Sequence, residues 1–197
     1  MNHGNVRVFV YGSLVSEPRQ FKDHISRESF QSWFNVEYAR CSSSRMGGPT
    51  VVPYDEGWPV EGELWELDLS ASSDLDAATR LFAKVERAPS TRNIVQGCVG
   101  DYPVVLYAAF PANIPEECGR LTPQLLARLA IRSVQLLDAD SDKNGIRYLR
   151  KAKARGILTP LTDLYVEAVL ALTGTEDLQD AEREARHVRL EGSGCCT

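Results

Sequence analysis

Val6-Arg7-Val8-Phe9-Val10-Tyr11-Gly12-Ser13-Leu14 is the stretch from which the fold of this chain is best inferred. β-Branched and aromatic residues fill it up to Tyr11, and a Gly-Ser pair follows, which is the pattern of a buried strand that ends in a turn. Glycine removes the steric barrier to unusual backbone dihedrals, so consecutive N–H groups in this loop can hold a carboxylate or carbonyl oxygen. A plain turn after an edge strand has the same pattern, and spacing alone favours the plain turn.

Further strand-like runs follow in the first 110 residues, separated by Gly, Pro and Asp turns. They are Phe34 to Cys41, Pro49 to Tyr54, Val60 to Leu67, Arg92 to Val99 and Pro103 to Phe110. One helix interrupts them, and a serine cap places its start near Ser72 or Ser73. Its apolar residues recur at helical spacing, which places Glu86 in its last turn.

After residue 120 the pattern predicts helices only. Thr122-Pro123 opens one helix, Pro160 opens another, and Gly145 to Arg155 forms a shorter helix with a basic face. The charged stretch from Thr175 on is expected to be a solvated helix or a frayed tail. Strands followed by helices predict an α+β fold: a small mixed, mostly antiparallel β-barrel or curled sheet with packed helices and extra C-terminal helices.

Length and composition favour one domain over residues 1–197. The chain has 197 residues, of which 43% are hydrophobic and 25% charged, and this is the balance of an ordinary globular protein. We expect a barrel-like catalytic core over 6–110, with one helix in it, and a helical extension over 120–190 packed on that core.

Charge and termini exclude several classes of partner. The formal net charge is -5 and no dense Lys/Arg tract occurs, which argues against nucleic acid and for a small or weakly charged partner. The sequence from Met1 to Leu14 contains neither a signal-peptide pattern nor a membrane span, so we expect a cytoplasmic protein with no membrane partner. Oligomeric state is left open by the sequence.

No metal site is predicted. The loop Asp140 to Gly145 matches the opening of an EF-hand, but Lys151 stands where the bidentate glutamate belongs, so we interpret the loop as a polar turn whose aspartates cap the next helix. The cysteines lack metal-like spacing and are interpreted as reduced thiols, Cys195 and Cys196 as part of a frayed tail. The full set of cysteines is Cys41, Cys98, Cys118, Cys195 and Cys196.

Three segments, in order, resemble the γ-glutamyl cyclotransferase family, including its AIG2-like and ChaC-like branches. They are Val8-Phe9-Val10-Tyr11-Gly12-Ser13-Leu14, then Gly48 to Pro53 with Val60 to Leu67, and finally Leu81-Phe82-Ala83-Lys84-Val85-Glu86-Arg87-Ala88-Pro89. The resemblance covers roughly residues 6–110, and Gly145 to Tyr165 is a looser match to ChaC-like members.

The resemblance implies an enzyme that cyclises the γ-glutamyl group of a small-molecule amide and releases 5-oxoproline and the free amine, without a metal or organic cofactor. It assigns γ-glutamyl binding to the backbone amides of Tyr11, Gly12, Ser13 and Leu14, and acid/base work to Glu86. A carboxylate suits that role, because the α-ammonium group of the substrate must lose a proton before it can attack.

The chain departs from the family pattern after Glu86. Many relatives have a tyrosine there, whereas this chain reads Pro89-Ser90-Thr91-Arg92-Asn93. Arg92 is a candidate for binding a substrate carboxylate, but the change equally fits altered specificity or lost activity. The alternative function is therefore a non-catalytic γ-glutamyl-binding or regulatory domain of the same fold. Glutathione, a γ-glutamyl dipeptide, a γ-glutamyl amine and an acylated antibiotic intermediate all remain possible substrates.

Overall fold

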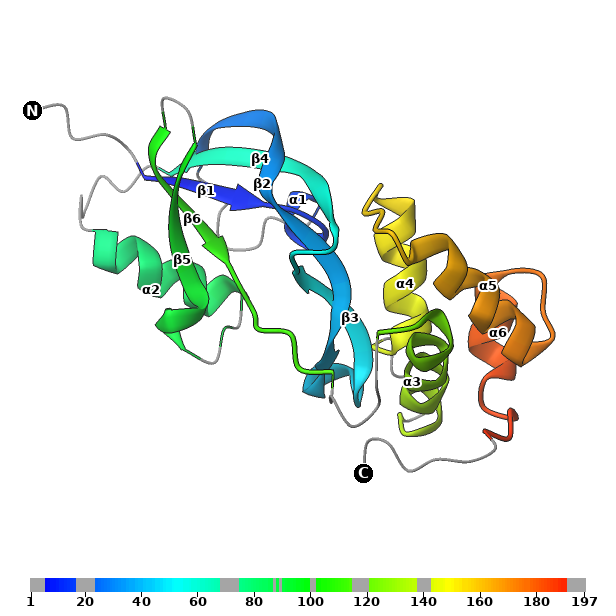
Figure 1. Ribbon diagram of the computed structural model, residues 1–197. Coiled ribbons are helices and arrows are strands. Elements are labelled where there is room, and N and C mark those ends of the chain that lie inside the picture. The colour runs from blue at the N-terminus through cyan, green and yellow to red at the C-terminus, as the bar shows by residue number, and fades with distance from the viewer. Residues whose placement is uncertain are drawn as a thin grey trace, which may run out of the picture. The chain divides into compact units, whose positions relative to one another are not determined.

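The computed structural model describes residues 6–16, 24–67, 75–86, 88, 90–99, 102–114, 121–137 and 143–190. Its strands and helices confirm the predicted α+β class (Figure 1). The strands are β1 (Arg7–Val10), β2 (His24–Ser42), β3 (Gly48–Pro53), β4 (Trp58–Leu67), β5 (Ile94–Val99) and β6 (Tyr102–Ala108). The helices are α1 (Ser13–Ser16), α2 (Leu75–Glu86), α3 (Pro123–Gln135), α4 (Gly145–Ala154), α5 (Thr162–Thr173) and α6 (Leu178–Glu184), with 3-10 turns η1 (Ser43–Arg45) and η2 (Thr91–Asn93).

The sheet is mixed and mostly antiparallel, as predicted. Its strands are hydrogen-bonded in the order β3-β2-β4-β1-β6-β5. Strand β1 is antiparallel to β4, with Val8 opposite Trp65, and parallel to β6, with Val8 opposite Leu106. Strands β5 and β6 form an antiparallel pair in which Gln96 lies opposite Leu106. The strand that carries the predicted loop is therefore an inner strand with a partner on each side.

The chain divides into two compact units. Met1–Phe34 and Pro59–Phe110 form the first, here called the strand unit, and Asn35–Trp58 and Pro111–Thr197 form the second, the helical unit. Strand β2 contributes to both, and its pairing with β3 lies in the helical unit, where Val36 is opposite Pro53. Strand β2 begins at His24, whereas the sequence predicted a start at Phe34.

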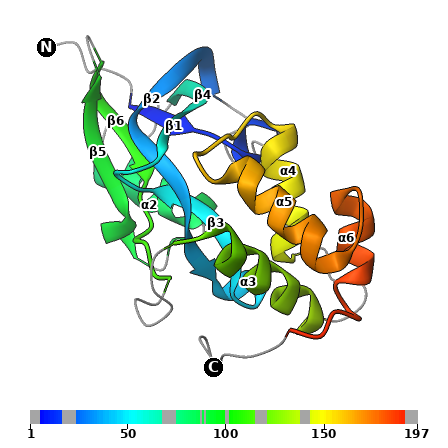
Figure 2. The ribbon, with the colours of Figure 1, turned by 45° about the vertical axis from the view of Figure 1, so that its right-hand side comes forward.

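The core of the strand unit lies between the sheet and α2. Side chains alternate across β1, so Val8 and Val10 share a buried cluster with Phe82 of α2, while Phe9 faces the other side and is 1% exposed. Helix α2 lies along β5 and β6 (Figures 1 and 2). Both faces of β1 are covered after Arg7, which explains why Val8, Phe9 and Val10 are apolar without alternation.

Ring contacts on the other side of the sheet show that it curls. In a flat sheet, β2 and β6 would lie about 14 Å apart, because β4 and β1 stand between them. The rings of Phe34 on β2 and Tyr107 on β6 nevertheless stack with centroids 4.7 Å apart. The curled sheet expected from the sequence is confirmed.

The helical unit packs α3, α4, α5 and α6 together (Figure 2). Helices α3 and α4 approach closely at Gly145, where an added Cβ would lie 2.8 Å from the Cα of Ala130. Ser133 joins the two helices, since its hydroxyl accepts from the Gly145 N–H and donates to the Ala130 carbonyl. Thr122 caps α3 as predicted.

The predicted start of α4 at Gly145 is confirmed, but its predicted cap and the predicted start of α5 need correction. The residue that caps α4 is Asn144, whose side chain accepts from the Arg147 N–H. Asp140 and Asp142, expected as caps, lie outside the described residues. Helix α5 begins at Thr162 rather than at Pro160, because Leu161 takes the N-cap position.

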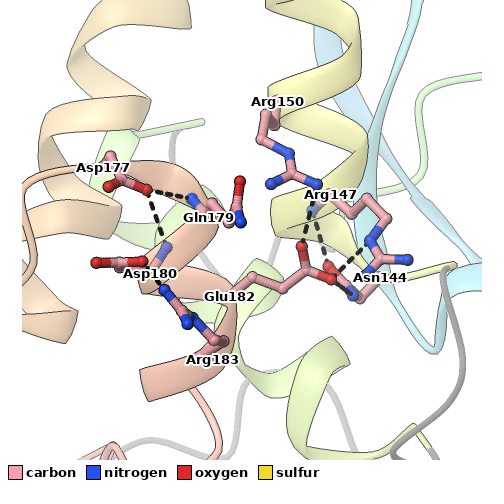
Figure 3. Close-up of polar contacts among 8 residues, drawn as sticks. All are labelled: Asn144, Arg147, Arg150, Asp177, Gln179, Asp180, Glu182 and Arg183. Atoms are coloured by element: carbon pink, nitrogen blue, oxygen red, sulfur yellow. Dashed lines mark hydrogen bonds and ion pairs between the residues drawn. The ribbon is translucent and has the colours of Figure 1, made fainter.

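The charged C-terminal stretch is more ordered than its composition suggests. Helix α6 buries Ala181 completely, and Ala185, just beyond its last residue, is also 0% exposed. Glu182 of α6 accepts hydrogen bonds from Asn144 and Arg147, at 2.8 and 2.7 Å, and lies 3.7 Å from Arg150 (Figure 3). Of the two expected states, the structure has the helix, and it differs from a fully solvated one because Ala181 and Ala185 are buried. Cys195 and Cys196 lie outside the described residues.

Within the described residues, no helix has both the length and the apolar character that crossing a membrane requires.

Candidate functional site

The Tyr11-to-Leu14 loop leaves β1 through a left-handed glycine. Gly12 has φ of 64°, a conformation that a side chain rarely adopts, and α1 begins at the next residue. This change of backbone direction can turn successive N–H groups toward one oxygen. The predicted binding of a γ-glutamyl group by backbone amides needs such a geometry. Leu14 is 2% exposed and anchors the loop in the core.

Glu86 is the last residue of α2, as predicted, and is half-buried. The residue before it, Val85, is 3% exposed and holds this end of the helix in the core. The Ala88 N–H donates to the Ala83 carbonyl at 2.8 Å, which closes the helix end just beyond Glu86. The carboxylate therefore projects from a backbone position that is fixed on both sides.

One hydrophobic cluster anchors both the loop and the helix end. Leu14 from the loop and Val85 from α2 belong to the same group of buried residues, which also includes Val10 at the end of β1. All the predicted site residues lie in the strand unit. The roles assigned to the loop and to Glu86 stay predictions, and the shared core gives the two segments a common support.

Arg92 lies on η2, a 3-10 turn that contacts α2. The Ser90 side chain caps this turn by accepting from the Arg92 N–H at 3.2 Å. Arg92 is exposed, so its guanidinium can reach a ligand without first being released from a buried position. Its contact with a substrate carboxylate stays a prediction.

The structure adds a group of residues that the sequence analysis did not name as a site. Around the buried ring of Phe9 lie five rings that are half-buried or exposed, here called the aromatic patch: Tyr11, Phe30, Trp33, Phe34 and Tyr107. Trp33 is 37% exposed, so part of its ring is accessible to a ligand. Burial raises the pKa of the Tyr107 hydroxyl above its ordinary value.

The patch could not be found from sequence spacing, because its rings come from three strands that are far apart along the chain. The one available signal was the density of aromatic residues in Phe30 to Phe34. Phe30 and Trp33 precede the strand start that was predicted at Phe34, so they had no expected partner.

Comparisons with known proteins give a fold likeness only. No protein-family model matches the chain, and no curated protein matches it. A crystal structure of a γ-glutamyl cyclotransferase specific to glutathione from yeast is similar over 85% of this chain and 98% of that chain, at 13% identity and a TM-score of 0.42. A selenomethionine-labelled γ-glutamyl cyclotransferase specific to glutathione from yeast is similar over 94% and 97%, at 12% identity and a TM-score of 0.37. At this distance the likeness leaves the family of the chain open.

Proposed function

We propose that the protein is a cofactor-independent γ-glutamyl cyclotransferase, which converts a γ-glutamyl amide into 5-oxoproline and a free amine. The observation that carries this proposal is the common anchoring of the two segments with family-like sequence: Leu14 of the loop and Val85, next to Glu86, share one buried cluster. Backbone donors and a carboxylate on a rigid support are the groups that this reaction needs.

Glu86 begins the reaction by taking a proton from the α-ammonium group of the substrate. The freed amine nitrogen attacks the γ-carbonyl carbon of the same molecule, and a five-membered ring closes. The bond between that carbon and the amide nitrogen then breaks, and Glu86 returns the proton to the departing amine. The ring nitrogen also gives up its second proton, which the amine takes up, so the products are the neutral lactam of 5-oxoproline and an ammonium ion. One carboxyl group thus serves as base and then as acid, and no external nucleophile or oxidant is consumed.

The Tyr11-to-Leu14 loop contributes by binding oxygen. Negative charge develops on the γ-carbonyl oxygen during attack, and backbone N–H groups beside Gly12 would stabilise it. The attacking and attacked groups belong to one molecule, so the protein mainly has to hold the glutamyl chain in its folded, reactive shape. A fixed loop at the end of an inner strand suits that task better than a free turn at a sheet edge.

The test is 5-oxoproline release from a panel of γ-glutamyl amides by the wild type, Glu86→Gln and Glu61→Gln. Glu61 is an exposed glutamate of β4 and provides the matched control. We expect Glu86→Gln to lower the rate about 100-fold to 10,000-fold, the usual contribution of a general acid/base, and Glu61→Gln to leave it unchanged. Equal rates in the wild type and Glu86→Gln would exclude the assigned role.

The alternative, a γ-glutamyl-binding or regulatory domain, is motivated by the missing tyrosine after Glu86. It predicts that γ-glutamyl amides raise the melting temperature of the wild type while no 5-oxoproline appears. Turnover that disappears in Glu86→Gln would exclude this alternative.

A further inference from the structure

The aromatic patch begins where the candidate loop begins. Tyr11 is shared between them, since its backbone opens the loop while its ring stacks on Phe9 with centroids 5.9 Å apart. The Tyr11 ring also meets Phe34 edge-on at 6.4 Å. From Phe34 the contacts continue to Tyr107 at 4.7 Å and to Trp33 at 5.3 Å, so a connected row of rings leads away from the loop.

Glycines make room for this row. An added Cβ at Gly97 of β5 would lie 2.7 Å from Cζ2 of Trp33, so the indole lies directly against the backbone there. An added Cβ at Gly62 of β4 would lie 2.8 Å from Cζ of Phe9. At Gly62 the added Cβ would also lie 2.3 Å from the Val10 carbonyl oxygen, so that glycine serves the close approach of β4 to β1 as well. At Gly97 a side chain would displace the indole, which indicates that Trp33 is held in a defined position.

The patch keeps apolar area accessible that a core would cover. Trp33 is 37% exposed, and Tyr11, Phe34 and Tyr107 are half-buried, whereas the ring of Phe9 beneath them is 1% exposed. Accessible rings in a fixed arrangement bind flat apolar or aromatic groups. The rings themselves provide π faces and apolar area, but no charge that would pair with a carboxylate.

We propose that the aromatic patch binds the amine part of the substrate, and that the protein acts on γ-glutamyl amides of arylalkylamines whose arylalkyl group carries no charge. The inference rests on the proposed function. Because Tyr11 belongs both to the loop and to the patch, the amide substituent of a γ-glutamyl group bound at the end of the loop where Tyr11 lies would meet the patch rings. The nearest ring surface beyond Tyr11 is Phe34 with Tyr107 and Trp33. An arylalkyl group there would lie against rings instead of water.

A pair of substrates isolates this contribution: γ-glutamyl-2-phenylethylamide and γ-glutamylethylamide, which differ only by the phenyl ring. We expect the wild type to show a kcat/KM at least about tenfold higher for the phenylethylamide. Trp33→Ala is expected to bring the ratio of the two kcat/KM values close to one, and Trp33→Phe to restore much of it. Trp58→Ala serves as the control, since Trp58 is 52% exposed and belongs to the helical unit.

Equilibrium binding of the same two amides to Glu86→Gln separates this inference from the proposed function. If the wild type turns over both amides with equal kcat/KM, the cyclotransferase proposal stands and the aromatic specificity is overturned. If neither amide is turned over, neither is a substrate, and the dissociation constants decide about the aromatic site. A phenylethylamide that binds about tenfold more tightly, and loses this advantage in the Trp33→Ala, Glu86→Gln double variant, supports the aromatic site, whereas equal dissociation constants overturn it.

Discussion

The two units differ in how far their carboxylates and aromatic rings are used to hold the fold. In the helical unit, Glu37 accepts hydrogen bonds from the Tyr38 and Leu161 N–H groups, and Glu182 joins two helices. In the strand unit, the aromatic patch stays partly exposed, and Glu86 lies half-buried at a helix end. Glu37 and Glu182 have partners that hold the helical unit together, although the buried hydroxyls of Tyr38 and Tyr165 have no hydrogen-bond partner among the described residues. The strand unit instead keeps surface available for a ligand. Substitutions in the helical unit should therefore lower stability, whereas substitutions in the strand unit should also lower activity.

Two left-handed glycines test this division most directly. Gly12 has φ of 64°. Gly156, just after α4, has φ of 72°, and an added Cβ there would have no heavy atom within 4 Å. Gly12→Ala and Gly156→Ala should each lower the free energy of unfolding by about 1 kcal/mol, since both force alanine into the same region. Only Gly12→Ala should also lower 5-oxoproline release, by about 100-fold, because it shifts the binding loop.

Urea unfolding and 5-oxoproline release measure the two effects separately. Loss of activity in both variants to the same extent would mean that the division between the units is wrong.

The contact between α4 and α6 provides the largest expected loss of stability (Figure 3). The Glu182 side chain is 11% exposed and binds Asn144 and Arg147, so Glu182→Ala should lower the free energy of unfolding by about 2 kcal/mol. Asp180 pairs with Arg183 on the surface of the same helix, and Asp180→Ala should change it by less than about 0.5 kcal/mol. Urea unfolding measures both, and equal losses would show that the contact does not hold α6.

A smaller expected effect is a dependence of folding stability on pH. Burial raises the pKa of the Glu37 carboxyl, and this outweighs the hydrogen bonds from Thr159, Tyr38 and Leu161, which lower it. The folded state therefore holds the proton more tightly than the unfolded state, so stability is greatest below the ordinary carboxyl pKa and falls as pH rises through the folded pKa. Glu37→Gln cannot titrate and should remove this loss.

The difference in melting temperature between the wild type and Glu37→Gln is the quantity to follow from pH 4 to pH 8. Other carboxyls cancel in this difference, and the hydrogen bond that glutamine cannot accept adds only a constant. We expect the wild type to lose stability relative to the variant as pH rises. A difference that is constant over this range would contradict the shift.

The elements predicted best from the sequence are those with local signals. Thr122 and Pro123 define the start of α3 because a capping side chain and a proline act within one turn of the chain. Glu86 was placed at the end of its helix by the spacing of apolar residues alone. The first half of β2 was missed because Arg27, Glu28 and Ser29 are polar and exposed, so they do not show the alternation of a half-buried strand.

The residues of the candidate site likewise fall into those that sequence motifs predict and those that only the fold brings together. The loop and Glu86 lie in short motifs that can be recognised along the chain, so they could be proposed from sequence. The row of rings could not, because Phe34 and Tyr107 meet only after the sheet has curled. Contacts of this kind depend on tertiary structure, which residue spacing does not encode.

The parallel pairing of β1 with β6 has a consequence for synthesis of the protein. Strand β1 is made first, yet Arg7 and Val8 pair with Val105 and Leu106, almost one hundred residues later. Such long-range pairing is slow to form and leaves a strand edge exposed meanwhile. During synthesis, β1 and the loop after it therefore lack one of the two neighbouring strands of β1 until β6 has left the ribosome. A nascent chain shorter than this should bind no γ-glutamyl ligand and should be prone to aggregate through the unpaired edge of β1.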